Sequence, residues 1–268
     1  IPSMISLIQK LLTKNMAYKK GGSVYLDTLK VNDFGKLSRL NKNQMLRIAK
    51  KFDEDLDNPD KKHPLDITLW RTSTPNQQIH IPSFDSPFGK GRPGWHIECS
   101  AMSTSTLGEQ IDIHGGGVDL KFPHHEAEIA QSEGATRKIP FAKYWLHTGV
   151  VYYQGQKMSK SKGNLVMVSK LLDKYSSNAI RWLLLSHRWN KKWEYREEDL
   201  VKAQKRVAIV EKAIPSQKDS LDAKISKEFS QILDNNLDIP KALQFLIKLA
   251  KQKTPGIKTL FQVLGFKA

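Results

Sequence analysis

The stretch QIDIHGGGVDLKFPHHEAEIAQSEG, residues 110–134, contains the clearest indication of fold class in this chain of 268 residues. It begins with a short strand candidate, Gln110–Ile113, which is followed by His114 and then three glycines. Its second half, His124–Gly134, is a helix candidate with Pro123 near the first turn. A strand that leads through glycines into a helix is typical of α/β folds with a parallel sheet.

The segments on either side extend this alternation of helices and strands. His96–Thr104 is a helix candidate before the quoted stretch, and Thr148–Tyr153 is a strand candidate after it. Further upstream, apolar residues at helical spacing predict an amphipathic helix over residues 3–17. Val24–Leu26 is another strand candidate, whereas residues 41–63 are polar and show little periodicity. The first two thirds of the chain therefore have the pattern of an α/β domain.

From Glu197 onward the pattern becomes helical. Three sets of apolar residues lie at helical spacing: Val201, Val207, Ile209 and Val210; Phe229, Ile232 and Leu233; and Ala242, Phe245, Leu246 and Leu249. These sets predict three amphipathic helices that pack as a bundle.

The composition favours a polyanionic partner. Lys plus Arg is 43 and Asp plus Glu is 27, so the formal net charge is +16. Such an excess points first to nucleic acid and second to an anionic membrane surface, although an AT-rich genome also produces Lys-, Ile- and Asn-rich proteins. No apolar run of about 18 residues and no signal peptide are present. The single cysteine rules out an internal disulfide, and we expect a cytoplasmic protein.

A candidate metal site combines residues from two helix candidates. Cys99 by itself has the character of a small buried apolar residue. His124 and Glu128 are four residues apart, so they lie on one helical face. A thiolate, an imidazole and a carboxylate form a zinc ligand set, and His125 with Glu128 is geometrically possible as well. Three protein ligands leave a position for a fourth ligand or a substrate.

Two further stretches have the chemistry of nucleotide binding. The glycines at 115–117 allow a flat ligand to approach the backbone, and Asp119 offers a carboxylate to ribose hydroxyls, although a plain tight turn has the same composition. Lys157-Met-Ser-Lys-Ser161 places Lys157 and Lys160 in a polar loop, where they can bind a triphosphate and stabilise departing pyrophosphate. A solvated lysine loop is the ordinary alternative.

The motifs together resemble one enzyme family. Lys157–Ser161 is the second signature of class I aminoacyl-tRNA synthetases. Gly94–Met102, His114–Leu120 and Phe122–Glu128 look like the motifs of bacterial cysteinyl-tRNA synthetases, and they occur in the same order. Phe229–Ala250 is similar to the helical domain that follows the catalytic core of that family.

This resemblance implies a fold and a domain order. We expect a partial Rossmann-like class I synthetase core with an inserted connective region, followed by an α-helical bundle. Residues 1–90 would form the end of the first Rossmann half and the connective insertion. Residues 91–165 would form the second half, with the zinc site and the lysine loop. Residues 166–200 would be a connecting stem, and residues 201–268 a tRNA-binding bundle.

The resemblance also implies an activity and a set of site residues. The activity is that of a cysteine–tRNA ligase, which forms cysteinyl-adenylate from L-cysteine and ATP with Mg²⁺ and transfers the cysteinyl group to tRNA(Cys). We expect one zinc ion per chain, a monomer and no membrane association. The implied zinc ligands are Cys99, His124 and Glu128. The implied substrate and nucleotide contacts are Trp95, His114, Gly115, Gly116, Gly117, Asp119 and Lys160, with Lys157 assisting.

The chain also departs from the family pattern. It lacks the first class I signature, His-Ile-Gly-His, a second cysteine ligand, and the anticodon-binding domain. It starts with Ile1, so we expect it to be part of a longer protein. A cysteine:amino-sugar ligase of mycothiol synthesis shares the adenylating core without an anticodon domain, but the +16 charge does not favour a small acceptor. A non-catalytic zinc- and RNA-binding paralogue fits the missing signature but not the intact Lys157–Ser161.

Overall fold

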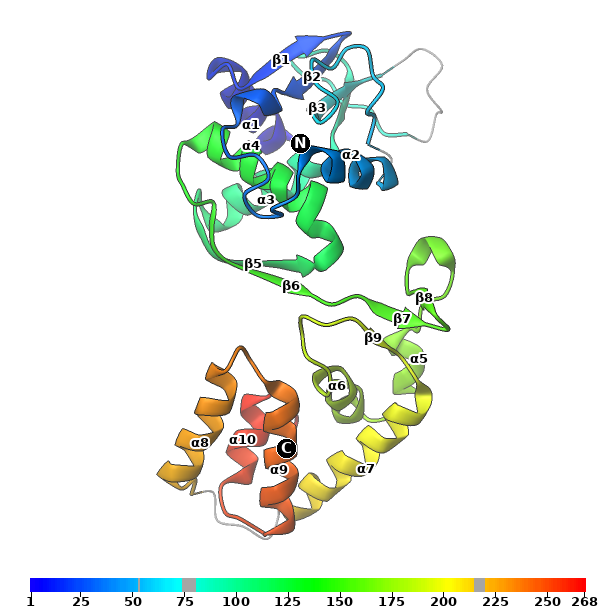
Figure 1. Cartoon of the computed structure of the whole chain (residues 1–268), viewed down its shortest axis with the longest axis vertical. Helices are drawn as coiled ribbons and strands as arrows, with labels where there is room; N and C mark the ends of the chain where they lie inside the picture. Colours follow the sequence, from blue (N-terminus) through cyan, green and yellow to red (C-terminus); the bar gives the residue numbers. More distant parts are fainter. Residues whose placement is uncertain (53, 74–80, 215–219) are drawn as a thin grey trace. The chain divides into compact units, whose positions relative to one another are not determined.

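The computed structural model describes residues 1–52, 54–73, 81–214 and 220–268, and divides the chain into two compact units (Figure 1). The first unit is Ile1–His147 and the second is Thr148–Ala268. The boundary between the two units falls inside segment 91–165, which the sequence predicted as one segment. The functions expected for the four sequence segments stay predictions.

The first unit contains a four-stranded antiparallel sheet with the strand order β1-β2-β3-β4. Its strands are β1 (Ala17–Lys20), β2 (Ser23–Leu26), β3 (Ile67–Thr72) and β4 (Gly91–Pro93). The sequence predicted only β2, because β3 and β4 lie far from it along the chain. The predicted parallel sheet is wrong for these four strands, which pair antiparallel.

Three helices enclose the main core of the first unit. They are α1 (Pro2–Thr13), α3 (Trp95–Leu107) and α4 (Glu126–Thr136), which pack against one another (Figure 1). Leu7, Ile8 and Leu11 form the buried face of α1, as the helical spacing predicted. The helix ends at Thr13, earlier than the expected residue 17, because Asn15 adopts a left-handed conformation with φ of 57°.

The quoted stretch folds as β5 (Ile111–Gly117), the turns Val118–Leu120 and Lys121–His125, and then α4, before β6 (Ala142–Thr148). The Ile111 amide donates to the Phe141 carbonyl at 2.9 Å, and a Cβ on Gly115 would lie 3.4 Å from the Leu146 carbonyl oxygen. Both strands therefore advance together and run parallel. The expected parallel arrangement is correct for this β–α–β segment.

Two boundaries in this segment differ from the expectation. The three glycines are the last residues of β5, so they do not form a turn after it. The α-helix begins at Glu126, because Lys121–His125 forms a wider π-type turn that includes the non-helical Phe122. The expected strand over 148–153 is divided at Gly149, where a Cβ would lie 1.9 Å from the Lys191 carbonyl oxygen.

One helix of the first unit was not expected. It is α2 (Lys42–Lys51), in the stretch without apparent periodicity. Asn41 and Gln44 form a reciprocal capping box at its start, which satisfies two backbone N–H groups. This Asn-x-x-Gln spacing is the signal in the sequence that could have located the helix.

The second unit is mainly helical. Its helices are α5 (Val168–Leu172), α6 (Ser177–Leu185), α7 (Glu197–Ala213), α8 (Ala223–Asp234), α9 (Ile239–Lys251) and α10 (Ile257–Val263). A small sheet of β7 (Val151–Tyr153), β8 (Gln156–Lys157) and β9 (Trp193–Glu194) precedes and interrupts them. The three predicted amphipathic helices correspond to α7, α8 and α9. They share one core with α6 and α10, which includes Trp182, Leu246 and Phe261.

In the part of the chain that the structure describes, no helix combines the length and the apolar character needed to span a bilayer.

Candidate metal and substrate site

The structure brings the three predicted zinc ligands together. Cys99 lies on α3, His124 lies in the turn before α4, and Glu128 lies in the first turn of α4. One potential ligand atom from each residue lies within 4.8 Å of those of the other two. Cys99 is half-buried, and only 5% of His124 and 0% of Glu128 is exposed. The close packing of α3 against α4 creates this cluster from residues 25 or more positions apart.

The Glu128 carboxylate shows that the cluster fits a cation. Its Oε2 accepts a hydrogen bond from His114 Nε2 at 2.9 Å. Its Oε1 is buried and has no hydrogen-bond partner among the described residues. A buried carboxylate oxygen without a partner is costly, and a bound metal ion would remove that cost. A zinc ion needs donors at about 2.0–2.3 Å, so the three groups would draw in around it.

A hydrogen-bond chain behind His124 determines which of its nitrogens faces the cluster. Glu54 Oε1 lies 2.8 Å from His96 Nε2, and His96 Nδ1 lies 2.9 Å from His124 Nδ1. Because a carboxylate only accepts, His96 donates from Nε2 and, as a neutral imidazole, accepts at Nδ1. His124 must then carry its proton on Nδ1. The lone pair of His124 Nε2 is left for a metal, which is the usual role of such partners.

The pKa values agree with neutral histidine in this cluster. Burial lowers the pKa of His124 to about 4, and burial together with His114 lowers the pKa of His125 to about 3. Burial raises the pKa of Glu54, but the hydrogen bond from His96 and the positive charges of Lys61 and Arg71 outweigh it, so the net pKa is lowered. Glu54 is therefore the ionised acceptor that the hydrogen-bond chain requires.

The thiol of Cys99 needs a cation before it can act as a thiolate. Burial raises its pKa, and the nearby carboxylates of Glu128 and Glu98 raise it further. At neutral pH this thiol stays protonated when no positive charge lies close to it. A bound zinc ion provides that charge and lowers the pKa of its ligand thiol.

A second histidine group shares Glu128 with the first cluster. Ligand atoms of His114, His125 and Glu128 also lie within 4.8 Å of one another, and His125 Nδ1 lies 2.8 Å from His147 Nε2. The possibility of pairing His125 with Glu128 therefore remains geometrically open. Only the first group contains a sulfur ligand, which is the donor that favours zinc most strongly.

Trp95 lies directly beside the metal cluster. Its ring centroid is 4.6 Å from that of His124 and 4.8 Å from that of His96. Phe52 stacks on the ring at 6.3 Å, and Trp95 is still 46% exposed. Trp95 and His96 both line a cavity of about 510 Å³. The residue predicted to contact substrate is thus placed where a small molecule in the cavity could reach both it and His96.

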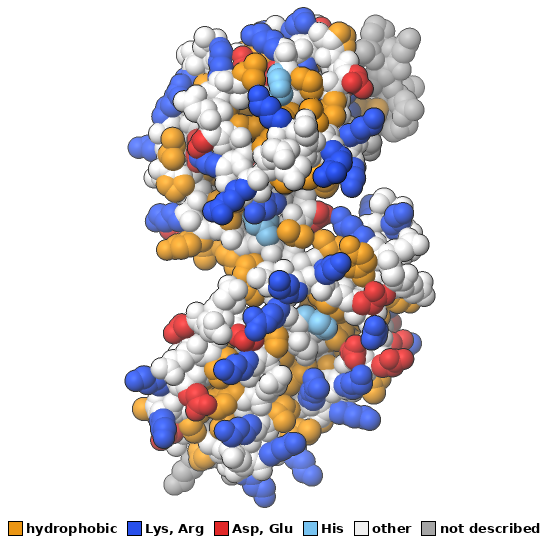
Figure 2. Space-filling model, viewed as in Figure 1, with side chains coloured by type: hydrophobic (Ala, Val, Ile, Leu, Met, Phe, Trp, Pro, Cys, Tyr) orange, Lys and Arg blue, Asp and Glu red, His pale blue; other side chains and the backbone are white. Residues whose placement is uncertain are grey.

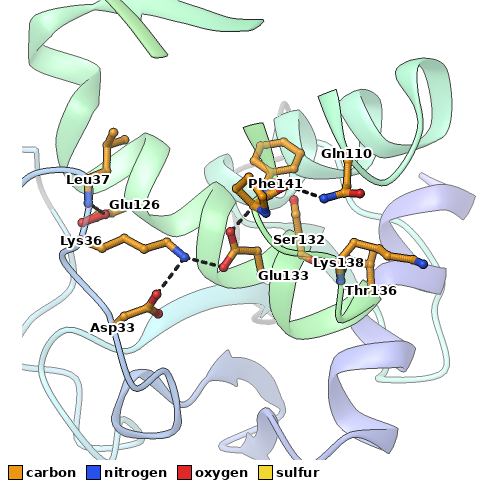
Figure 3. Close-up of polar contacts among 11 residues, drawn as sticks. Asp33, Lys36, Leu37, Gln110, Glu126, Ser132, Glu133, Thr136, Lys138 and Phe141 are labelled. Carbon is orange, nitrogen blue, oxygen red and sulfur yellow. Dashed lines mark hydrogen bonds and ion pairs between the residues drawn. The ribbon is translucent and has the colours of Figure 1, made fainter. Parts of the chain in front are cut away.

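Partly buried polar contacts hold α4 in place (Figure 3). Glu133 accepts from Lys36 Nζ at 2.6 Å and from the Phe141 amide at 2.9 Å, and Asp33 lies 2.9 Å from Lys36. Burial lowers the pKa of Lys36, but the hydrogen bonds from Lys36 to Asp33 and Glu133 more than compensate and raise it overall. At the start of α4, Glu126 accepts from the Leu37 amide at 2.7 Å. These contacts fix the helix that carries Glu128.

The glycines of β5 have packing roles of their own. A Cβ on Gly116 would lie 2.9 Å from His125 Cε1, and a Cβ on Gly117 would lie 2.4 Å from Asp119 Oδ1. Larger residues would therefore displace the histidine group and Asp119. His114 directs Nε2 at Glu128, so its side chain is already partly engaged. The predicted contacts of Gly115–Gly117 and Asp119 with adenosine stay a prediction.

The lysine loop belongs to the second unit. Lys157 ends β8, and Lys160 begins a 3₁₀ turn that ends at Lys162. Asn164 closes the loop, because its side chain accepts from the Ser159 amide at 2.9 Å and donates to the Lys157 carbonyl at 3.2 Å. Lys157 and Lys160 are both exposed, which suits residues predicted to bind phosphates.

Sequence reasoning missed Glu54, His96 and His147 as part of the site. His96 lies three positions before Cys99 on the same helix, a spacing that could have associated the two. Glu54 follows α2 in a polar stretch, and nothing in the sequence connects it with His96.

The comparisons with known proteins agree with the motifs. Residues 1–205 match the family model described as tRNA synthetases class I (C) catalytic domain. A cysteine–tRNA ligase from Dehalococcoides mccartyi is 44% identical over 260 residues, which cover 94% of this chain and 55% of that protein. A cysteine–tRNA ligase from Legionella pneumophila is 41% identical over 285 residues, with coverages of 99% and 59%.

A third relative carries a different name. An L-cysteine:1D-myo-inositol 2-amino-2-deoxy-alpha-D-glucopyranoside ligase from Thermomonospora curvata is 40% identical over 257 residues, with coverages of 96% and 61%. A crystal structure described as a putative arginyl tRNA synthetase from Campylobacter jejuni has a TM-score of 0.55 at 15% identity, covering 100% of this chain and 61% of that one. That likeness shows the fold alone. The chain spans between 55% and 61% of the length of these relatives.

Proposed function

This chain belongs to the family of class I (C) tRNA synthetase catalytic domains, and from that premise we propose that its protein is a cysteine–tRNA ligase. It would activate L-cysteine with ATP and Mg²⁺ and transfer the cysteinyl group to tRNA(Cys). The observation that carries this proposal is the cluster of Cys99, His124 and Glu128 beside the half-exposed Trp95. We also expect a monomer in the cytoplasm with one zinc ion per chain.

The metal cluster would supply the selectivity for cysteine. Cys99, His124 and Glu128 would hold zinc, which when bound coordinates a thiolate far better than an alcohol. A hydrophobic pocket alone separates near-isosteres such as cysteine and serine by only about 100-fold. The Glu54–His96 chain would keep His124 in the tautomer that presents Nε2 to the ion.

The remaining predicted residues would serve the substrate and the nucleotide. Trp95 would cover the cysteine side chain from its place beside His124. Backbone at Gly115–Gly117, together with His114 and Asp119, would contact the adenosine. Lys160, assisted by Lys157, would bind the phosphates and stabilise the charge that develops on pyrophosphate as the cysteine carboxylate attacks the α-phosphate.

A cysteine:amino-sugar ligase is the second candidate, favoured by the Thermomonospora curvata relative at 40% identity. Both candidates adenylate cysteine, so the cluster does not separate them. The net charge of +16 favours the RNA acceptor, because a small amino sugar without phosphate groups gains nothing from a basic surface. The intact Lys157–Ser161 opposes a third candidate, a non-catalytic zinc- and RNA-binding paralogue, since such a protein has no use for a phosphate-binding loop.

Cysteine-dependent ATP–pyrophosphate exchange by the full-length protein tests the shared first step. The acceptor is then identified by offering tRNA(Cys) and glucosaminyl-inositol in parallel reactions with labelled cysteine. We expect exchange with cysteine, essentially none with serine, and transfer to the tRNA. Transfer to the sugar alone would select the second candidate, and exchange that does not depend on cysteine would refute both ligases.

A further inference from the structure

The lysine loop is carried by a small sheet whose middle strand is β7. On one side β8 pairs antiparallel with β7 and leads directly into the loop, and on the other side β9 pairs parallel with β7 (Figure 1). The Met158 amide extends the pairing, because it donates to the Val151 carbonyl at 2.9 Å. The position of Lys157 and Lys160 therefore depends on what holds this sheet.

Residues 187–195, here called the bridging segment, hold the β7–β8 hairpin from the side of β9. The Gly149 amide, just before β7, donates to the Trp189 carbonyl at 2.7 Å. At the other end of β7, in the turn of the hairpin, the Gly155 amide donates to Glu194 Oε1 at 2.8 Å. The bridging segment thus contacts the hairpin both where it begins and where it turns.

The bridging segment is also attached to the turn between α8 and α9. Trp189 Nε1 donates to the Asn236 carbonyl at 3.0 Å. Arg188 Nη2 donates to Asp238 Oδ2 at 3.0 Å, and only 7% of Asp238 is exposed. Asp238 also caps α9, because its Oδ1 accepts from the Lys241 amide. Trp189 therefore connects two parts of the unit, since its carbonyl binds the start of β7 and its indole binds the helical bundle.

The turn that receives these contacts has a backbone conformation that residues with a Cβ rarely adopt. Asn236 and Leu237 lie one after the other in the left-handed region, with φ of 52° and 51°. Such conformations persist where the surrounding structure fixes them. Trp189 and Arg188 bind the residues on either side of Leu237. The bridging segment is therefore anchored on a turn of defined conformation.

The chemistry proposed for the lysine loop makes its placement important. A group that stabilises developing charge acts only near its productive geometry, and a misplacement of about 1 Å can cost about a hundredfold in rate. Lys157 and Lys160 are exposed, so few side-chain contacts restrain them. The fold controls their position mainly through the backbone of the hairpin.

We propose that Arg188 and Trp189 are positioning residues for adenylate formation, which hold the β7–β8 hairpin, and with it the lysine loop, in a fixed place on the helical bundle. The proposal rests on the proposed function, because there the loop acts on the phosphates of ATP. Arg188 and Trp189 act through the hairpin and do not themselves bind ATP.

The double variant Arg188→Gln/Trp189→Phe of the full-length protein removes both contacts to the α8–α9 turn and keeps side chains of similar size. We expect kcat for cysteine-dependent ATP–pyrophosphate exchange to fall about tenfold and KM for cysteine to stay within about twofold, because only the placement of the lysines changes. Arg188→Lys alone should retain most of the rate, since an ammonium can still pair with Asp238. The matched control is Lys174→Gln, which removes an exposed ion pair of the same unit, 4.0 Å to Glu197, outside the bridging segment.

A Lys160→Ala background separates positioning of the loop from a general structural effect. There the double substitution should lower the residual exchange rate by less than about twofold, because residues that act as a unit are not additive. A loss as large as in the Lys160-containing protein would overturn the proposal, as would an unchanged rate in the Lys160-containing protein itself. If the double variant melts early, Trp189→Phe alone, which keeps an aromatic ring, is judged by the same comparison.

Deuterium uptake tests the link between the bridging segment and the loop without an assay of activity. The amides of Met158 and Ser159, which donate to Val151 and to Asn164, should take up deuterium faster in the double variant, whereas those of α4 in the first unit should not change. If the unsubstituted protein shows no cysteine-dependent exchange of pyrophosphate, the proposed function fails and deuterium uptake alone decides. Unchanged uptake at both amides would then refute the positioning role.

Discussion

We expect His96 to contribute to metal binding although it is not a predicted ligand. Replacing it by Phe removes the acceptor for His124 Nδ1, so His124 is free to rotate or change tautomer. Mutation of a residue that hydrogen-bonds a metal-ligating histidine typically lowers metal affinity about 10- to 100-fold. We expect a loss of zinc affinity in that range, measured by competition with a chromophoric chelator.

The control for this prediction is His187→Gln, because His187 lies in the second unit. That variant should bind zinc as tightly as the unsubstituted protein. An unchanged zinc affinity of the His96→Phe variant would show that His124 is held by other contacts.

The buried histidines make the metal-free protein sensitive to acid. The ordinary pKa of histidine is 6.5, whereas burial lowers it to about 4 for His124 and about 3 for His125. Between pH 6.5 and 4.5 the unfolded chain takes up protons on both side chains and the folded chain does not, so the free energy of unfolding falls as the pH falls. Allowing for solvent screening, we expect a loss on the order of 1 kcal/mol per pH unit.

Urea unfolding of the metal-free protein at several pH values checks this slope. His125→Gln should make the slope shallower, because one of the two depressed groups is removed. A free energy of unfolding that stays constant from pH 6.5 to 4.5 would mean that the histidines are protonated, and therefore more open to water, in the folded protein.

The residues of the metal cluster were largely predictable, and their partners were not. Cys99, His124 and Glu128 could be selected because sulfur, imidazole and carboxylate ligands stand out by type and because the last two share a helical face. Glu54 could not, since its role depends on a contact with His96 across 42 positions of the chain. Long-range contacts between common residue types leave no periodic signal.

At the scale of elements, α4 is the helix that positions Glu128, and the partly buried ion pair of Lys36 with Glu133 fixes it. Glu133→Gln keeps an acceptor for the Phe141 amide but removes the charge that pairs with Lys36. The Lys36 ammonium would then keep only Asp33 as a charged partner. This loss should lower the free energy of unfolding by about 1–3 kcal/mol. Chemical denaturation measures the change.

Lys143→Gln is the matched control for that helix contact. It removes an ion pair of similar length, 2.8 Å to Asp112, but on the exposed surface. Exposed pairs contribute little, so we expect no measurable change. Equal effects of the two substitutions would show that burial does not strengthen the contact to α4.

The lysine loop is the element predicted to act on phosphates. Lys160→Ala should reduce ATP–pyrophosphate exchange by about a hundredfold or more while cysteine affinity changes little, because the lysine acts on charge that develops in the transition state. Lys162→Ala, at the last residue of the same 3₁₀ turn, serves as a charge-matched control that should retain most activity. Equal losses in rate and cysteine affinity would contradict this role.

The elements that could be predicted are those with a local pattern. Helices α7, α8 and α9 show clear apolar periodicity, whereas α10 has seven residues, too few for the period to be distinctive. In the sheet from β1 to β4, β2 pairs with β3 across more than 40 positions, and this pairing depends on packing that no short stretch encodes. The division of β6 from β7 depends on one close backbone approach at Gly149.

At the scale of the whole molecule, the basic character is distributed over both units. Lys and Arg side chains appear on the visible face of each unit (Figure 2). On α7, Lys202, Lys205 and Arg206 are exposed while Val207 and Val210 are buried in the helical core. This separation fits the proposal that residues 201–268 present a solvated basic face to tRNA.

The central claim is that Cys99, His124 and Glu128 hold a zinc ion that selects cysteine. The most direct test measures zinc content and ATP–pyrophosphate exchange with cysteine and with serine for the full-length protein and its Cys99→Ser variant. We predict one zinc per unsubstituted chain, together with loss of zinc and of most of the preference for cysteine in the variant. A demonstrably zinc-free Cys99→Ser variant that still prefers cysteine to the same degree would contradict the claim.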